Sequence, residues 1–216
     1  MDEIAHASGQ DPVEMRLKLL DGAGDNAGGD KPWNVGGAKR LANALRAAVG
    51  RSGYGAIKLG PNEGMGVACV SSQERTFPTW TACVAQVKID PSSGEITLKK
   101  LTLAMDVGTA VNPDGVRAQI EGSVLWGASL ALLENATMKD GGIEQRNFDT
   151  YTPMRMRQLP ELDISIIANG EPAVGCGEPA VTVIAPAIGN AIFNAVGARV
   201  RSLPITPEAV KAAMKT

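Results

Sequence analysis

The sequence predicts an α+β fold in which antiparallel strands pack against helices. Before the turn sequence Asp90-Pro91-Ser92-Ser93-Gly94, which is typical of a β-hairpin, Val84, Gln86 and Lys88 alternate with Ala85, Val87 and Ile89. On both sides of this hairpin, apolar residues recur at helical spacing. We therefore expect strands and helices to share one core.

Composition excludes several classes of protein. The 216 residues can form one large domain or two small ones, and 44% hydrophobic with 20% charged residues is ordinary for a globular chain. No apolar run approaches the roughly 18 residues that span a bilayer, so direct membrane insertion is not expected. Basic and acidic residues, 21 and 23, nearly balance, and no basic cluster is interleaved with aromatics, so nucleic acid is not an expected partner.

The first fifty or so residues are predicted to form a helical extension. A helical turn over 3–7 precedes Asp11-Pro12, where Asp11 as cap and Pro12 at the first helical position predict a helix over 12–20. Residues 21–31 are rich in Gly, Asp and Asn and predict a surface loop. A second helix is expected over 37–49, ended by Gly50. We therefore divide the chain into an extension, 1–50, and a larger unit, 51–216.

The larger unit is predicted to begin with strands over 65–71, 80–90 and 95–106. Asn112-Pro113 should then begin a helix that runs to about residue 133. In this helix, Gly122, Ser123 and Gly127 would let another element approach closely.

The rest of the chain is expected to return to the sheet and end in helices. A turn at Gly141-Gly142 precedes a buried strand over 162–168. An almost wholly apolar helix follows over 179–196, which Pro186 should kink or interrupt, and a short helix over 207–214 ends the chain.

Cysteine and histidine usage narrows the chemistry. Cys69, Cys83 and Cys176 are odd in number and widely spaced, which fits neither a disulfide framework nor a paired-cysteine metal site. The first two are expected to be buried free thiols. His6 is the only histidine, so a histidine-rich zinc site is excluded and a catalytic triad would have to recruit that residue. No metal-ligating side chain is assigned.

Glu178 is the strongest candidate for a catalytic residue. In Val174-Gly175-Cys176-Gly177-Glu178-Pro179 it occupies the expected N-cap position of an apolar helix, although glutamate is not a preferred cap. The positive end of the helix would stabilise its carboxylate, while apolar neighbours would let it titrate nearer neutrality, as a base requires. The alternative, a surface glutamate at a loop–helix junction, stays open.

Gln119 is the second candidate, because an amide with two donors and one acceptor suits a heterocyclic cofactor. A glutamine exposed on a helix surface is the usual alternative. Cys176 could line a pocket, although a small buried thiol is commoner. Arg155, Arg157 or Tyr151 could line an entrance or simply be solvated.

Four runs in order resemble one protein family: Met105-Asp106-Val107-Gly108, Asn112-Pro113, Gln119-Ile120-Glu121-Gly122 and Gly177-Glu178-Pro179. Together they resemble the end of the molybdenum-cofactor-binding subunit in the xanthine oxidase family of molybdenum hydroxylases. The opening residues 2–7 and 11–14 are similar to the branch of isoquinoline 1-oxidoreductase and related bacterial aldehyde dehydrogenases. The resemblance implies the aldehyde oxidase/xanthine dehydrogenase type of molybdenum-cofactor-binding domain, with 51–216 as its C-terminal molybdopterin-binding portion.

The resemblance also implies an activity, the oxidation of an aldehyde or the hydroxylation of an N-heterocycle with water as oxygen source. Glu178 would remove a proton from the Mo-OH group, and Gln119 would bond the pterin. Gly175, Cys176 and Gly177 would belong to the loop facing the metal, which the dithiolene of the pterin would hold. The implied cofactor is molybdopterin cytosine dinucleotide with molybdenum, shared with the rest of the subunit, and electrons would leave through [2Fe-2S] clusters on a partner subunit.

The cofactor motifs that the family carries earlier in the subunit are absent from this sequence. We therefore expect a fragment or one part of a split subunit, inactive alone and completed by the upstream part. The compartment stays open between cytoplasm and bacterial periplasm, since residues 1–7 do not have the features of a secretory signal.

Two other functions are compatible with parts of the sequence. One is a non-catalytic scaffold or subunit-contact module of the same fold. The other is a cofactor-free hydrolase with Glu178 and Asp106 as a carboxylate pair, which would need both carboxyl groups in an open cleft.

Overall fold

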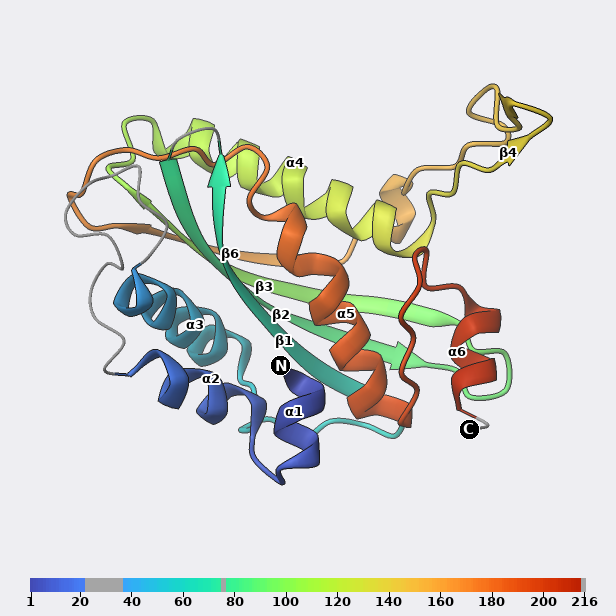
Figure 1. The fold of residues 1–216 in the computed structure, drawn as a ribbon, viewed down its shortest axis with the longest axis horizontal. Helices are drawn as coiled ribbons and strands as arrows, with labels where there is room; N and C mark the ends of the chain where they lie inside the picture. Colours follow the sequence, from blue (N-terminus) through green and yellow to red (C-terminus); the bar gives the residue numbers. More distant parts are fainter. Residues whose placement is uncertain (22–36, 75–76, 215–216) are drawn as a thin grey trace.

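A four-stranded sheet with helices on both faces forms the body of the protein in the computed structural model, which describes residues 1–21, 37–74 and 77–214 (Figure 1). The sheet has the order β1-β2-β3-β6, and β4 and β5 form a separate hairpin. The strands are β1 (Glu63–Glu74), β2 (Phe77–Ile89), β3 (Ile96–Gly108), β4 (Met138–Lys139), β5 (Gly142–Ile143) and β6 (Glu161–Ala168). The helices are α1 (Asp2–Ala7), α2 (Pro12–Leu20), α3 (Ala38–Ser52), α4 (Pro113–Leu132), α5 (Val181–Val196), α6 (Pro207–Ala213) and the short 3₁₀ helix η1 (Met156–Gln158).

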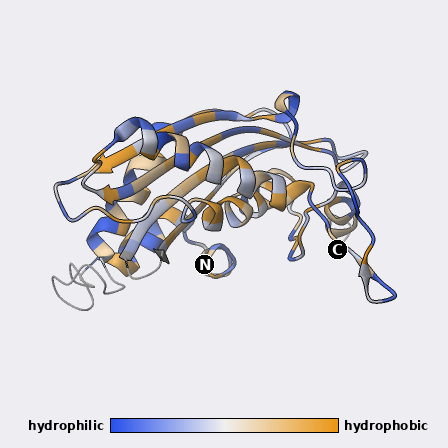
Figure 2. Cartoon of the chain, turned by 90° about the horizontal axis from the view of Figure 1, so that it is seen from above, coloured by the Kyte–Doolittle hydropathy of each residue, from blue (hydrophilic) through white to orange (hydrophobic). Residues whose placement is uncertain are grey.

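Strand alternation divides the core into two layers. On β2, Cys83, Ala85 and Val87 face the cluster that contains α4 and α5, whereas Ala82 and Val84 face the cluster that contains α3. Figure 2 shows hydrophobic residues concentrated along the strands and the helices that cover them. In the described ranges, no helix combines the length and apolarity that crossing a membrane requires.

The predicted α+β fold of antiparallel strands and packed helices is confirmed. Strands β1, β2 and β3 are antiparallel neighbours, and the hairpin turn lies between Ile89 and Ile96. Strand β6 instead pairs with β3 in parallel, an arrangement that the sequence analysis did not include. Helix α4 lies in the connection between these strands, because parallel neighbours need a crossover.

Helix α5 lies against β1, the strand at one edge of the sheet. Asn190 and Asn194, one turn apart, donate side-chain hydrogen bonds to the carbonyls of Val67 and Met65 at 3.0 and 2.7 Å. A Cβ at Gly66 would lie 2.1 Å from the backbone nitrogen of Ala191. Glycine therefore allows the helix backbone to approach the edge strand closely enough for its amides to satisfy strand carbonyls.

Several sequence predictions about elements are confirmed. Asp11 caps α2 by accepting from Val13 N and Glu14 N, and Asn112 caps α4 by accepting from Gly115 N. Helices α1 and α6 lie within about one residue of the expected bounds. The predicted loop over 21–31 lies outside the described residues after its first position, and the turn predicted at Gly141-Gly142 is formed one residue earlier.

Two predictions about elements are wrong, and a third is wrong in part. Helix α3 continues through Gly50 and ends at Gly53, because Gly53 and not Gly50 adopts the left-handed conformation, at φ 73°. Pro186 does not interrupt α5, since packing of the apolar face holds the helix together on both sides of it, while the alternative that it kinks the helix stays a prediction. Strand β6 is not fully buried, because it forms a sheet edge where only Ile164 is enclosed.

The N-terminal segment contributes directly to the core. Leu45 and Ala48 of α3 are fully buried in one cluster with Val84 of β2. Arg16 and Asp2 form a buried ion pair at 2.5 Å between α2 and α1. The division of the chain at residue 50 stays a prediction.

Two glycine substitutions should have opposite effects on stability. Gly66→Ala should lower the free energy of unfolding by about 2 to 3 kcal/mol, because the added methyl group meets the α5 backbone. Gly50→Ala should raise it by about 1 kcal/mol, since Gly50 is exposed inside α3 with open space at the Cβ position. Urea unfolding of the chain followed by circular dichroism measures both changes, and an unchanged Gly66→Ala variant would show that α5 does not lie this close to β1.

Candidate functional site

The loop between β6 and α5, residues 169–180, carries Glu178. The loop lies along the end of β3, where Asn169 N donates to Gly108 O at 3.0 Å and Val174 N donates to Val107 O at 3.2 Å. Gly108 has a φ of 68°, and a Cβ there would lie 2.1 Å from the carbonyl oxygen of Pro172. Only glycine permits this approach, so the end of β3 and the loop fit together through a residue without a side chain.

Asp106 anchors the start of this loop. Its carboxylate accepts two hydrogen bonds from Arg40, at 2.5 and 3.0 Å, and contacts of 3.0 and 3.2 Å from the side-chain amide of Asn169. The backbone nitrogen of Gly108 donates a further bond at 3.1 Å. Arg40 itself stacks on Trp80, 3.7 Å from the ring centroid. Asp106 is only 1% exposed, so these donors offset the cost of burying its charge.

Two hydroxyl groups hold the loop near Glu178. Thr79 of β2 donates to the carbonyl oxygen of Gly175 at 2.6 Å. Ser123 of α4 donates to the carbonyl oxygen of Glu178 at 3.3 Å and accepts from Val181 N at 3.0 Å. The loop is therefore attached to β2 on one side of Glu178 and to α4 on the other.

The sequence analysis predicted that Glu178 is the N-cap of α5, and this prediction is wrong. The N-cap is Ala180, because Pro179 and Ala180 form a turn in which Val181 N donates to the carbonyl oxygen of Glu178 at 3.0 Å. Alanine has no side chain that can cap a helix, and the hydroxyl of Ser123 supplies an acceptor from a neighbouring helix instead.

The other predicted site residues lie around the same junction of α4 and α5. Gln119 is exposed and precedes Ser123 by four residues, so the two lie on one side of α4. Gly175, Cys176 and Gly177 are partly exposed in the loop before Glu178. Ser123 thus connects the helix that carries Gln119 to the loop that carries Glu178.

The side chains of Glu178 and Gln119 are both exposed. Within the described part of the chain, neither has a hydrogen-bond or ion-pair partner. Asp106, by contrast, is enclosed and bonded to Arg40. A hydrolase that uses Glu178 and Asp106 as an open carboxylate pair is therefore not supported.

The cysteines are free thiols. Cys83 is fully buried as expected, and burial raises its pKa strongly. Cys69 is only partly buried, which differs from the expectation, and desolvation raises the pKa of its thiol as well. Across the described ranges, no three His, Cys, Asp or Glu side chains gather as they would around a metal ion.

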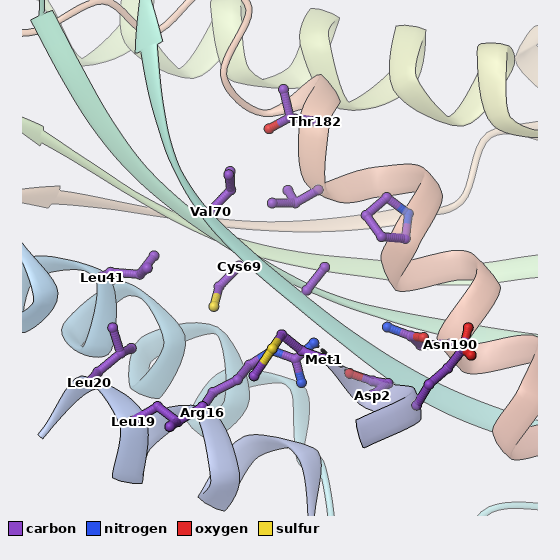
Figure 3. A pocket seen from close by; sticks show the side chains of 14 residues that line it. Met1, Asp2, Arg16, Leu19, Leu20, Leu41, Cys69, Val70, Thr182 and Asn190 are labelled. Carbon is purple, nitrogen blue, oxygen red and sulfur yellow. Dashed lines mark ion pairs between the residues drawn. The ribbon is translucent and has the colours of Figure 1, made fainter. Parts of the chain in front are cut away.

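A cavity of about 500 Å³ lies between α1, α2, α3, β1 and α5 (Figure 3). The buried Asp2–Arg16 pair, Cys69 and Asn190 contribute polar atoms to its wall. Thr182 in the first turn of α5 also lines it, but none of the predicted site residues does.

The candidate entrance residues lie at the opposite end of α4. Tyr151 donates a short hydrogen bond to Glu134, which lies just beyond the end of α4 and about 15 Å along the helix from Ser123. Arg157 lines a groove with residues at the start of β3, and Arg155 lies at the beginning of η1. Tyr151, Arg155 and Arg157 therefore do not lie beside Glu178 in the fold of this chain.

Sequence reasoning missed the residues that position the loop. Ser123 was noted only as a small residue that permits close approach, and nothing in the sequence distinguished Thr79 from other strand threonines. The sequence analysis also did not single out Arg40, which is partly buried against Trp80 and Asp106. A buried aspartate at a strand end indicates that a distant cation exists, but it does not identify that cation.

Comparison with known proteins identifies relatives over nearly the whole chain. Residues 40–160 match the profile of a family described as molybdopterin cofactor-binding domain. A protein from Gluconacetobacter polyoxogenes named membrane-bound aldehyde dehydrogenase [pyrroloquinoline-quinone] is 47% identical over 96% of this chain and 27% of its own length. Isoquinoline 1-oxidoreductase subunit beta of Brevundimonas diminuta is 28% identical over 96% of this chain and 24% of its own length.

Solved structures share the fold. The aldehyde oxidoreductase from Desulfovibrio desulfuricans ATCC 27774 aligns with a TM-score of 0.56 and 27% identity, over 64% of this chain and 16% of that protein. The chain therefore spans about a quarter or less of the length of these relatives.

Asp106→Ala should lower the free energy of unfolding by about 3 to 5 kcal/mol, because it leaves Arg40 and Asn169 without their shared acceptor. Arg51→Ala provides the control, since the Arg51–Asp163 pair is more exposed and should contribute less than about 1 kcal/mol. Urea unfolding of the chain measures both. Equal effects would contradict the anchoring role of Asp106.

Proposed function

Because this chain belongs to the molybdopterin cofactor-binding domain family, within the xanthine oxidase family of molybdenum hydroxylases, we propose that it is part of a molybdenum-dependent oxidoreductase. The enzyme would oxidise an aldehyde or hydroxylate an N-heterocycle with water as oxygen source. The observation that carries this proposal is the exposed carboxylate of Glu178, held beside the helix of Gln119 in a chain of this family.

Glu178 would act as the general base. Its carboxylate has no partner in the described part of the chain, so its lone pairs are available to accept a proton from an oxygen nucleophile. Gly175 and Gly177 contribute no side chains that would obstruct the approach of a substrate.

The residues around Glu178 fit a pterin cofactor. Gln119 presents an unengaged amide, whose two donors and one acceptor match the mixed edge of a heterocycle. The loop of Gly175, Cys176 and Gly177 is partly exposed and could lie against a bound cofactor. When bound, the molybdenum cofactor supplies the two-electron redox chemistry that side chains lack.

The complete enzyme would need further components. We propose that the upstream part of the subunit supplies the remaining cofactor contacts, since this chain spans only 27% of its aldehyde dehydrogenase relative. The cofactor would be the cytosine dinucleotide form, and a partner with [2Fe-2S] clusters would remove the electrons. The isolated chain would then be inactive.

The identity of the cofactor can be tested directly, because the same relative is named for pyrroloquinoline quinone. Elemental analysis of the complete purified enzyme should find molybdenum, and an acid extract should contain no pyrroloquinoline quinone. An assembly with neither molybdenum nor pyrroloquinoline quinone would instead support the non-catalytic scaffold, and one with the quinone alone would overturn the proposed cofactor.

Glu178→Gln in the complete enzyme should lower kcat by at least about 100-fold, because the amide cannot accept the proton. Molybdenum content should stay unchanged, since glutamine preserves size. Glu171→Gln, in the same exposed loop, is the matched control and should leave kcat unchanged. Near-normal turnover of Glu178→Gln, measured with saturating aldehyde or N-heterocycle substrate, would rule out Glu178 as the base.

A further inference from the structure

We propose that Thr79 and Ser123 form a hydroxyl clamp, one hydroxyl on each side of Glu178, that positions the carboxylate for catalysis. The inference rests on the proposed role of Glu178 as base. The two residues lie on different elements, β2 and α4, and each bonds a main-chain carbonyl of the loop. The bonded carbonyls belong to Gly175 and to Glu178 itself, so the clamp encloses the segment that carries the base.

Thr79 is the contact on the sheet side. It is fully buried, and its hydroxyl donates to the carbonyl oxygen of Gly175 at 2.6 Å. Strand β2 lies between β1 and β3, so this hydroxyl belongs to an interior strand of the sheet. Thr79 therefore connects the glycine-containing loop to the sheet.

Ser123 is the contact on the helix side. It is 4% exposed, and its hydroxyl both donates to the carbonyl oxygen of Glu178 and accepts from Val181 N. One turn further along α4, Gly127 lets the helices meet, since a Cβ there would lie 2.9 Å from Ile184 Cγ1. Close packing of α4 on α5 thus sets the position of the hydroxyl.

The loop needs these contacts because glycines at 175 and 177 leave its main chain many accessible conformations. Glu178 lies outside any helix or strand, so its side-chain direction follows from its main-chain position. A base displaced by about 1 Å can lose on the order of 100-fold in rate, because proton transfer depends on close alignment. Fixing two carbonyls that flank the segment restricts this displacement.

The clamp predicts a specific kinetic defect. In the complete enzyme, Thr79→Val and Ser123→Ala should each lower kcat about 10- to 100-fold, while KM changes less than about 3-fold and molybdenum content is unchanged. Thr79→Ser keeps a hydroxyl and should retain near-normal kcat. If Thr79→Val does not fold, Ser123→Ala and Thr79→Ser decide the question.

Two neighbouring residues provide matched controls. Thr81 is as buried as Thr79 on the same strand, but its hydroxyl has no hydrogen-bond partner among the described residues. Ser129 is 4% exposed on α4 like Ser123, but its hydroxyl accepts from Met154 N at 2.8 Å, away from the loop. Thr81→Val and Ser129→Ala should therefore leave kcat unchanged.

Combination with Glu178→Gln separates the clamp from the proposed function. If the clamp acts through Glu178, Ser123→Ala should cause no further loss in the Glu178→Gln background. A further loss of the same size, a fall in molybdenum content, or an equal defect in the controls would overturn the clamp. Normal turnover of Glu178→Gln would overturn the proposed function itself, whereas an inactive Glu178→Gln with fully active clamp variants would overturn the clamp alone.

Discussion

The buried carboxylate of Asp106 is the interaction on which the arrangement of the site depends. It joins α3 through Arg40, the end of β3 through Gly108, and the loop after β6 through Asn169. A charge with 1% exposure is stable only when donors surround it, so these three segments must meet at one place. The path of the loop toward α5 begins at that meeting point.

From this anchor the loop passes over β2 and reaches α4 before it enters α5. Each step has a polar contact: Thr79 bonds Gly175, and Ser123 bonds both Glu178 and Val181. Below the loop, α5 packs on the edge strand and α4 packs on α5. A base on an otherwise exposed loop can therefore have a defined position, which the proposed chemistry requires.

Local patterns predicted much of the fold. The hairpin around Pro91 and the capped helices were predicted correctly, since turn and cap residues act within a few positions of the chain. The errors at Gly50, Pro186 and β6 have a different origin. Whether a glycine ends a helix, a proline interrupts one or a strand is buried depends on what packs against that element.

The sequence by itself determined the types of the elements and the family, because ordered motifs and local periodicity can be recognised without knowing which residues are in contact. Only the tertiary structure decided how Glu178 is held. Its clamp joins residues 96 and 55 positions apart, and Arg40 reaches Asp106 across 66 positions. Such contacts follow from how the layers pack. No local pattern of residues specifies which hydroxyl will bond the loop or which guanidinium will bond Asp106.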